Sequence, residues 1–141
     1  MSNQKPLFHA EMVNETGVNG EAFVKNDGLN VKLSSPLSKE EGTNPEELLG
    51  LSFSTCLNAT IQSLLKARGK ETTSRVEVHV DFVRESNGIG YFFNVEAFAK
   101  IDGLSFEESE KIVEEAEHRC PVSKLLAGSK TVSVKAVEDF K

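Results

Sequence analysis

The stretch GTNPEELLGLSFSTCLNATIQSLLKARG, residues 42–69, decides the fold because it predicts one long helix with well-marked ends. At its start, Asn44 can accept bonds from the free amides of the first turn, and Pro45 suits the first helical position. Glu47 follows three residues after Asn44, as in a capping box. At its end, Gly69 favours the left-handed conformation that stops a helix.

The apolar residues of this helix do not keep to one side, so we expect a core helix. They surround the helix axis at Leu48, Leu49, Leu51, Phe53, Cys56, Leu57, Ala59, Ile61, Leu64 and Leu65. No charged residue occurs between Glu47 and Lys66, but Ser, Thr, Asn and Gln interrupt the stretch too often for a membrane span. Cys56 is therefore expected in the interior, midway along the helix.

Length and charge set the class of protein. At 141 residues we expect a single domain over 1–141, long enough to bury roughly two thirds of its unfolded surface. The net charge of −6 and the lack of a basic stripe argue against nucleic acid and anionic lipid as partners. The first five residues lack the apolar region of a secretory signal, so we expect a cytoplasmic protein whose two cysteines are free or redox-active.

Alternation of polar and apolar residues predicts six strands around this helix. Three strands precede it, at 8–13, 20–25 and 29–34, and three follow it, at 75–85, 89–101 and 130–140. A second, amphipathic helix is predicted from Ser105, which opens a capping box with Glu108, to about Arg119. Single helices between runs of strands indicate an α+β fold with antiparallel sheets around the buried central helix.

The central helix also predicts an oligomer. A helix that is apolar all round needs cover on every side, and short strands with one further helix cover it incompletely. Phe92 and Phe98 lie on the opposite side of their strand from Tyr91 and Phe93, which suits a partner subunit or an apolar pocket. We therefore expect a homodimer.

Cys56 and Cys120 are the candidate reactive residues, because both fall on inward faces of helices. A buried free cysteine is commonly a small core hydrophobe, and this interpretation stays open for both. The alternative is a redox pair, in which a thiolate attacks an O–O bond and the second thiol resolves the sulfenic acid as a disulfide. A zinc site is disfavoured because the two cysteines lack the close Cys or His spacing of such sites, and His118, two residues before Cys120, is the single hint of one. No metal site and no cofactor are expected.

Two segments resemble the signature segments of the OsmC/Ohr family, the osmotically inducible and organic hydroperoxide resistance proteins. The first is GTNPEELL, 42–49, with Cys56 ten residues after Glu46, and the second is CPVSK, 120–124. The order of strands and helices agrees over almost the whole chain. The resemblance implies an intertwined dimer that reduces organic hydroperoxides to alcohols and is recycled by lipoyl-type dithiols. It also implies that Cys56 is peroxidatic, Cys120 resolving and Glu46 an active-site glutamate.

The chain departs from the organic hydroperoxide branch of this family in two places. That branch carries an arginine in the first hairpin loop, in a Gly-Arg-x-Gly setting, where this chain has Val18 between Gly17 and Asn19. It also has Cys-Pro-Tyr-Ser where this chain has Cys-Pro-Val-Ser, which favours the OsmC branch or an offshoot.

The missing arginine matters for the reactivity of Cys56. A mid-helix thiol gains little from the helix dipole, and burial in apolar surroundings raises its pKa, so a cation must take the place of the arginine. The candidates are Lys32, Lys39, Arg75 and Arg84. Without such a cation Cys56 is a sluggish thiol.

The position of Glu46 poses a geometric problem. In one straight helix the ten residues from Glu46 to Cys56 span about 15 Å, too far for contact. Either the helix start bends away, or the glutamate acts across a dimer interface, which supports a shared site. The plainer interpretation of Glu46 is a first-turn carboxylate favoured by the helix dipole, and that of Glu47 is simple capping.

Three functions are compatible with the sequence. The first is an organic hydroperoxide peroxidase with Cys56 and Cys120 as its thiol pair. The second is a dimer that keeps both cysteines but binds a small apolar ligand, with Val18 marking the lost peroxidase electrostatics. The third is a structural dimer with inert core thiols. The reactivity of Cys56 toward peroxide discriminates among them.

Overall fold

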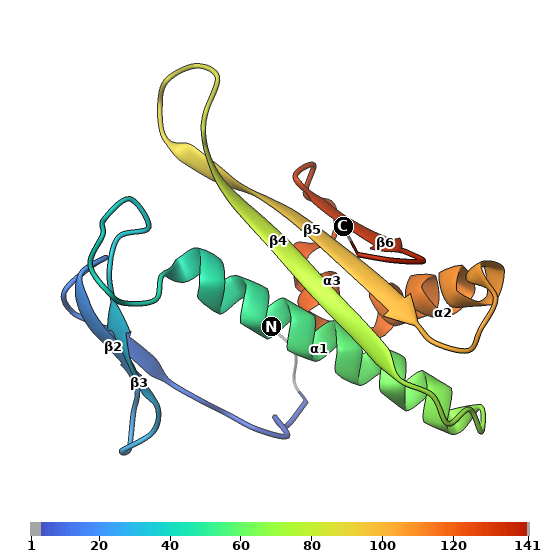
Figure 1. Cartoon of the computed structure of the whole chain (residues 1–141). Coiled ribbons are helices and arrows are strands. Elements are labelled where there is room, and N and C mark those ends of the chain that lie inside the picture. The colour runs from blue at the N-terminus through green and yellow to red at the C-terminus, as the bar shows by residue number, and fades with distance from the viewer. Residues whose placement is uncertain (1–3, 141) are drawn as a thin grey trace. The chain divides into compact units, whose positions relative to one another are not determined.

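The computed structural model describes residues 4–140 and divides the chain into two compact units, Met1–Pro45 and Glu46–Lys141. Its elements are β1 (Met12–Asn14), β2 (Gly20–Val24), β3 (Asn30–Leu33), α1 (Pro45–Ala67), β4 (Ser74–Arg84), β5 (Tyr91–Ile101), α2 (Phe106–Arg119), α3 (Pro121–Leu126) and β6 (Val132–Ala136) (Figure 1). The predicted α+β class is confirmed, with two three-stranded sheets over residues 4–140. The single domain stays a prediction. The cytoplasmic location was predicted from the first five residues, and residues 1–3 of these lie outside the described residues.

The first unit is an antiparallel sheet in the order β1-β2-β3. Pairing of β1 begins at Met12, opposite Val24, so this strand is shorter than predicted. The β2–β3 turn has positive φ at Asn26 (66°) and Asp27 (61°). Asn and Asp tolerate this conformation better than other residues with a side chain, so these two residues suit the turn.

The sheet of the second unit has the order β4-β5-β6 and is mixed. β4 and β5 form the predicted long antiparallel hairpin, in register from Ser74 opposite Ile101 to Arg84 opposite Tyr91. β6 instead pairs with β5 in parallel, with Val134 opposite Ala97. The expected antiparallel pairing is wrong for this strand because α2 and α3 form a crossover between β5 and β6, which parallel neighbours require.

The core of the second unit lies between one face of this sheet and the helices α1 and α2. Alternate residues of β5 are buried, and so are one stripe of α1 and one stripe of α2. The buried residues are Phe53, Leu57, Ile61, Leu64, Leu65, Val95, Ala97, Ala99, Ile101, Ile112, Val113, Ala116 and Cys120. Both helices therefore cover the same face of the sheet, and Figure 1 shows α1 running alongside β4.

Helix α1 is buried along one stripe rather than all round. Leu51 is 64% exposed, and Thr55, Ala59 and Gln62 are exposed on the same side. By length and composition alone α1 is long and apolar enough to cross a membrane. The core helix of a soluble protein meets the same two criteria. Because its buried stripe belongs to the main hydrophobic cluster, α1 is a core helix with one uncovered, uncharged side.

Local chemistry fixes the ends of the helices and the contact between α1 and β4. Gly69 has φ +69° and stops α1, and the Ser105 hydroxyl accepts the Glu108 amide 3.2 Å away as the predicted cap of α2. The amide of Asn58 donates to the Ser74 carbonyl (3.3 Å), and the Ser74 hydroxyl donates back to the Asn58 side-chain oxygen (2.6 Å). This pair ties the middle of α1 to the start of β4.

Candidate active site

The two predicted reactive cysteines lie on different elements of the second unit. Cys56 is in the middle of α1, half-buried at the margin of the buried stripe. Cys120 is fully buried, at 0% exposure, between α2 and α3. Its amide donates to the Ala116 carbonyl (2.8 Å) to end α2, and its carbonyl accepts the Lys124 amide (2.9 Å) to begin α3. Pro121 suits the first position of α3, where an N–H would have no helical partner.

The fold brings these two thiols together although 64 positions separate them in the sequence. The Cys120 side chain and the backbone N–H of Val122 both lie close enough to the Cys56 thiol to shift its pKa. Both cysteines are free thiols in this structure. The Cys-Pro-Val segment thus places one thiol and one amide donor against Cys56.

The surroundings of Cys56 raise its pKa. Burial is the largest cause, because it penalises the charged thiolate. The Val122 N–H acts the other way and lowers the pKa by stabilising the thiolate, while the Cys120 side chain raises it again. Within residues 4–140, the groups that shift the pKa of Cys56 include no Lys or Arg side chain.

The predicted substitute cations on β4 are engaged elsewhere. The Arg75 guanidinium bonds a Glu77 carboxylate oxygen at 2.7 Å and lies 5.0 Å from the centre of the Phe140 ring. The Arg84 guanidinium lies 5.0 Å from the centre of the Tyr91 ring. Their prediction as partners of Cys56 is therefore not supported by their contacts.

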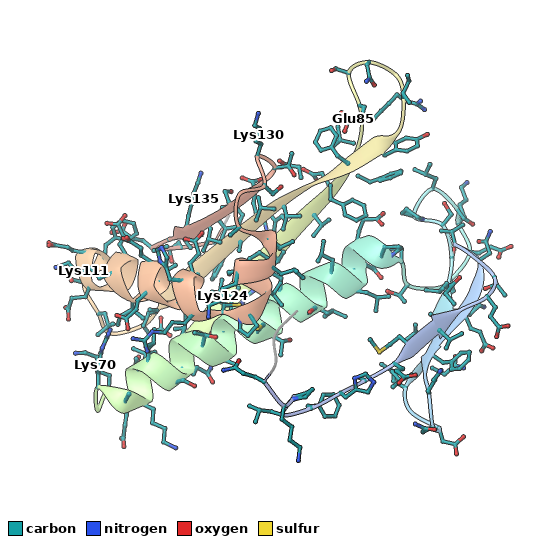
Figure 2. The ribbon with its side chains drawn as sticks, turned by 180° about the vertical axis from the view of Figure 1, so that it is seen from behind. Lys70, Glu85, Lys111, Lys124, Lys130 and Lys135 are labelled. Carbon is teal, nitrogen blue, oxygen red and sulfur yellow. The ribbon has the colours of Figure 1, made fainter. Side chains whose placement is uncertain are left out.

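The labelled lysines of the second unit lie at its outside (Figure 2). Lys111 projects from α2 and Lys124 from α3, and both are exposed. The other predicted candidates, Lys32 and Lys39, belong to the first unit and are exposed there. Val18, which stands where the family's arginine was expected, is also in the first unit and is 46% exposed.

Glu46 is half-buried in the first turn of α1 and lines a groove of about 540 Å³. The groove runs between α1 and β4, with Gly50 and Leu51 on one wall and Val76 to Val80 on the other. Neither Cys56 nor Cys120 lines this groove. This agrees with the separation of about 15 Å that a straight helix predicts between Glu46 and Cys56. The structure brings Cys56 and Cys120 together and leaves Glu46 apart, so the role of this glutamate stays a prediction.

Two neighbours of the thiol pair were not predicted as functional. The Val122 amide could have been found, because Pro121 after Cys120 signals a new helix start whose first amides are free. Ser123 is 7% exposed, and within residues 4–140 its hydroxyl has no hydrogen-bond partner. It lines a cavity of about 60 Å³ beside Phe53. No sequence signal indicates a buried, unpaired hydroxyl at this position.

Comparison with known proteins gives the family of the chain. The profile of the OsmC-like protein family matches residues 38–135. OhrA of Bacillus subtilis, an organic hydroperoxide resistance protein, is 25% identical over 139 residues, which cover 95% of this chain and 99% of that protein. These names support a role in organic hydroperoxide resistance at the level of the family.

Solved structures agree with the fold. A protein from Lactobacillus casei, provisionally described as a redox protein, has a TM-score of 0.91 at 40% identity, covering 99% of this chain and 96% of that one. An organic hydroperoxide resistance protein from Elizabethkingia anophelis has a TM-score of 0.86 at 25% identity, with 96% and 100% covered. The predicted OsmC/Ohr likeness is confirmed, and the chain belongs to the OsmC-like family.

Proposed function

We propose that this protein is a thiol-dependent peroxidase that reduces organic hydroperoxides to alcohols. The observation that carries the proposal is that the Cys56 thiol, in the middle of α1, lies close enough to the Cys120 thiol, at the α2–α3 junction, for one to shift the pKa of the other. Family membership and relatives named for organic hydroperoxide resistance support it. Two inert core thiols would not need a backbone amide donor at one of them, whereas a thiol that must ionise gains from one.

In the proposed reaction Cys56 is the peroxidatic residue, because it is the more accessible thiol. Its thiolate attacks the distal oxygen of the hydroperoxide, the O–O bond breaks, and the alkoxide takes a proton and leaves as the alcohol. Cys56 is then a sulfenic acid. The Cys120 thiol attacks its sulfur, water leaves and a disulfide forms. A dithiol of the lipoyl type reopens the disulfide and is itself oxidised.

The electrostatic cost of this reaction lies in ionising a buried thiol. The Val122 amide offsets part of that cost, and a cation is still needed, because burial alone makes Cys56 slow. Of the predicted candidates, Arg75 and Arg84 hold other partners. Glu46 is proposed as the active-site glutamate on the family likeness, acting across the interface of a cytoplasmic homodimer.

A thiol titration by stopped flow tests the function. The reduced protein is mixed with one equivalent of cumene hydroperoxide and, separately, hydrogen peroxide, and free thiols are counted over time. We expect fast loss of both thiols with the alkyl substrate. Cys56→Ser should abolish the reaction, and Cys120→Ser should lose one thiol and stop at the sulfenic acid. Two thiols that stay unreacted with the alkyl substrate would contradict the proposal.

The raised pKa of Cys56 favours one alternative, a dimer that binds a small apolar ligand without thiol chemistry. In that case Val18 marks the loss of the peroxidase electrostatics. The same titration separates the two functions, because the alternative predicts unreacted thiols together with tight binding of an apolar ligand. Binding of such a ligand can be measured by displacement of a fluorescent fatty acid.

A further inference from the structure

Unequal access to the two sulfurs points to how the proposed peroxidase is recycled. Cys120 belongs to the main hydrophobic cluster and is 0% exposed. Cys56 only packs against that cluster and is half-buried. In the single chain, a molecule arriving from solvent can therefore reach Cys56, whereas Cys120 is closed off.

Thiol–disulfide exchange turns this difference into a choice of sulfur. The attacking thiolate must contact one of the two sulfurs, and the other sulfur leaves. Cys120 is held between two helix ends by backbone bonds to Ala116 and Lys124, at 2.8 and 2.9 Å. Exposing its sulfur to an external thiol would require the α2–α3 junction to open, whereas Cys56 needs no such movement.

The quality of the leaving group agrees with the choice set by access. A thiol with a higher pKa leaves more slowly, and burial raises the pKa of Cys56. The Val122 amide opposes this effect, but it is the smaller of the two causes. Expelling Cys56 in the first, intermolecular step is thus disfavoured by its surroundings, and attack on Cys56 leaves its release to the second, intramolecular step.

We propose that the reducing thiol attacks the sulfur of Cys56 and expels Cys120, so that Cys56 alone meets both the peroxide and the reductant. This inference rests on the proposed function. The reductant's thiolate forms a mixed disulfide with Cys56 as the intramolecular S–S bond breaks, and Cys120 leaves as a thiolate and takes a proton. The second thiol of the dithiol then attacks its own mixed-disulfide sulfur, closes its own ring and releases Cys56 as the thiol.

The attacked sulfur can be identified with a monothiol, which cannot complete the second step. The wild-type protein is oxidised with one equivalent of cumene hydroperoxide, and loss of both thiols is checked by alkylation. Cysteamine is then added for a short time, and acid quenches exchange by protonating thiols. After unfolding and labelling with N-ethylmaleimide, trypsin cuts after Lys39, Lys66, Arg119 and Lys124, so the two cysteines fall on separate peptides.

We expect cysteamine on the peptide of Cys56 and N-ethylmaleimide on the peptide of Cys120, with this arrangement favoured by about tenfold or more. The reverse arrangement, an even mixture, or a disulfide that resists cysteamine would overturn the inference and leave the peroxidase intact. Failure to form the disulfide is seen before cysteamine is added, and it overturns both proposals. Oxidised protein unfolded in urea is the control, because both sulfurs are then exposed and the preference should disappear.

Discussion

The Cys56 thiol shows how single neighbours set reactivity. Burial and the Cys120 side chain raise its pKa, and the Val122 amide lowers it. Replacing Cys120 by Ala deletes one of the raising groups and admits water beside Cys56. We therefore expect the pKa of Cys56 to fall in Cys120→Ala, measured as the midpoint of the pH profile for alkylation by iodoacetamide.

The sign of this effect follows from the reactive species. The thiolate is the nucleophile, so a lower pKa moves the rise of the alkylation rate to lower pH and makes the reaction faster near neutrality. Ser123→Ala is the matched control, because it shortens a neighbouring side chain that does not shift the pKa of Cys56. An unchanged midpoint in Cys120→Ala would show that the two thiols do not interact in solution, and a higher midpoint would show that Cys120 stabilises the Cys56 thiolate, which contradicts the prediction.

The reactive residues could be predicted from the sequence more fully than their surroundings. Cys56 and Cys120 stand in recognisable segments, and helix periodicity placed both on inward faces. Their mutual contact depends on how α1 packs beside the α2–α3 junction, which is a long-range property that periodicity does not encode. The position of Glu46 was limited in the same way. The helical rise predicted how far it lies from Cys56 along α1, but no sequence pattern predicted which other residues it contacts.

At the scale of elements, helices and hairpins were predicted well because their signals are local. The caps, the Gly69 stop and the alternation along β4 and β5 all lie within a few residues of the structure they specify. The pairing direction of β6 was predicted wrongly, since it depends on the path of the chain through α2 and α3. The one-sided burial of α1 also differs from the prediction, because its composition does not say which side is covered.

The packing of α1 on β4 makes a prediction about Gly50. A Cβ added there would lie 3.7 Å from a Val80 methyl group and 3.9 Å from the Val78 carbonyl, which is ordinary contact. Alanine also costs less backbone entropy than glycine inside a helix. We expect Gly50→Ala to raise the free energy of unfolding by about 0.5–1 kcal/mol, measured by urea denaturation at a fixed protein concentration.

A larger side chain at the same position provides the contrast. Gly50→Leu places further carbons beyond a Cβ that already contacts Val80 and Val78, so we expect it to lower the free energy of unfolding relative to Gly50→Ala. If Gly50→Ala is itself destabilising, the helix must approach the strand more closely in solution than these distances indicate. Equal stability of both variants would show that the groove beside Gly50 has room to spare.

At the scale of the whole molecule, the proposed disulfide would link the middle of the long helix to the α2–α3 junction. The link closes a loop of 64 positions between Cys56 and Cys120, and loop closure of this length stabilises by up to about 4 kcal/mol. We expect the peroxide-oxidised protein to unfold at higher urea than the reduced protein. Cys120→Ser should show no such increase, and a less stable oxidised form would indicate a strained link.

The uncovered side of α1 carries the prediction about assembly. Leu51 is 64% exposed, and the exposed Thr55, Ala59 and Gln62 continue an uncharged surface along the helix. A single chain gains nothing by keeping charge away from about three turns of exposed helix, whereas the core of an interface between copies favours it. We expect sedimentation equilibrium to give about twice the chain mass of 15.5 kDa for the wild type.

Ala59→Glu tests whether this surface is the interface. A carboxylate buried there without a partner costs several kcal/mol, so the variant should dissociate toward the monomer. Ala59→Ser keeps a small, neutral side chain and should remain a dimer. If the wild type sediments as a monomer, this side of α1 is exposed in solution. The proposal that Glu46 acts across a dimer interface would then be wrong. If Ala59→Glu remains a dimer, the copies meet elsewhere, and the uncharged side of α1 requires another explanation.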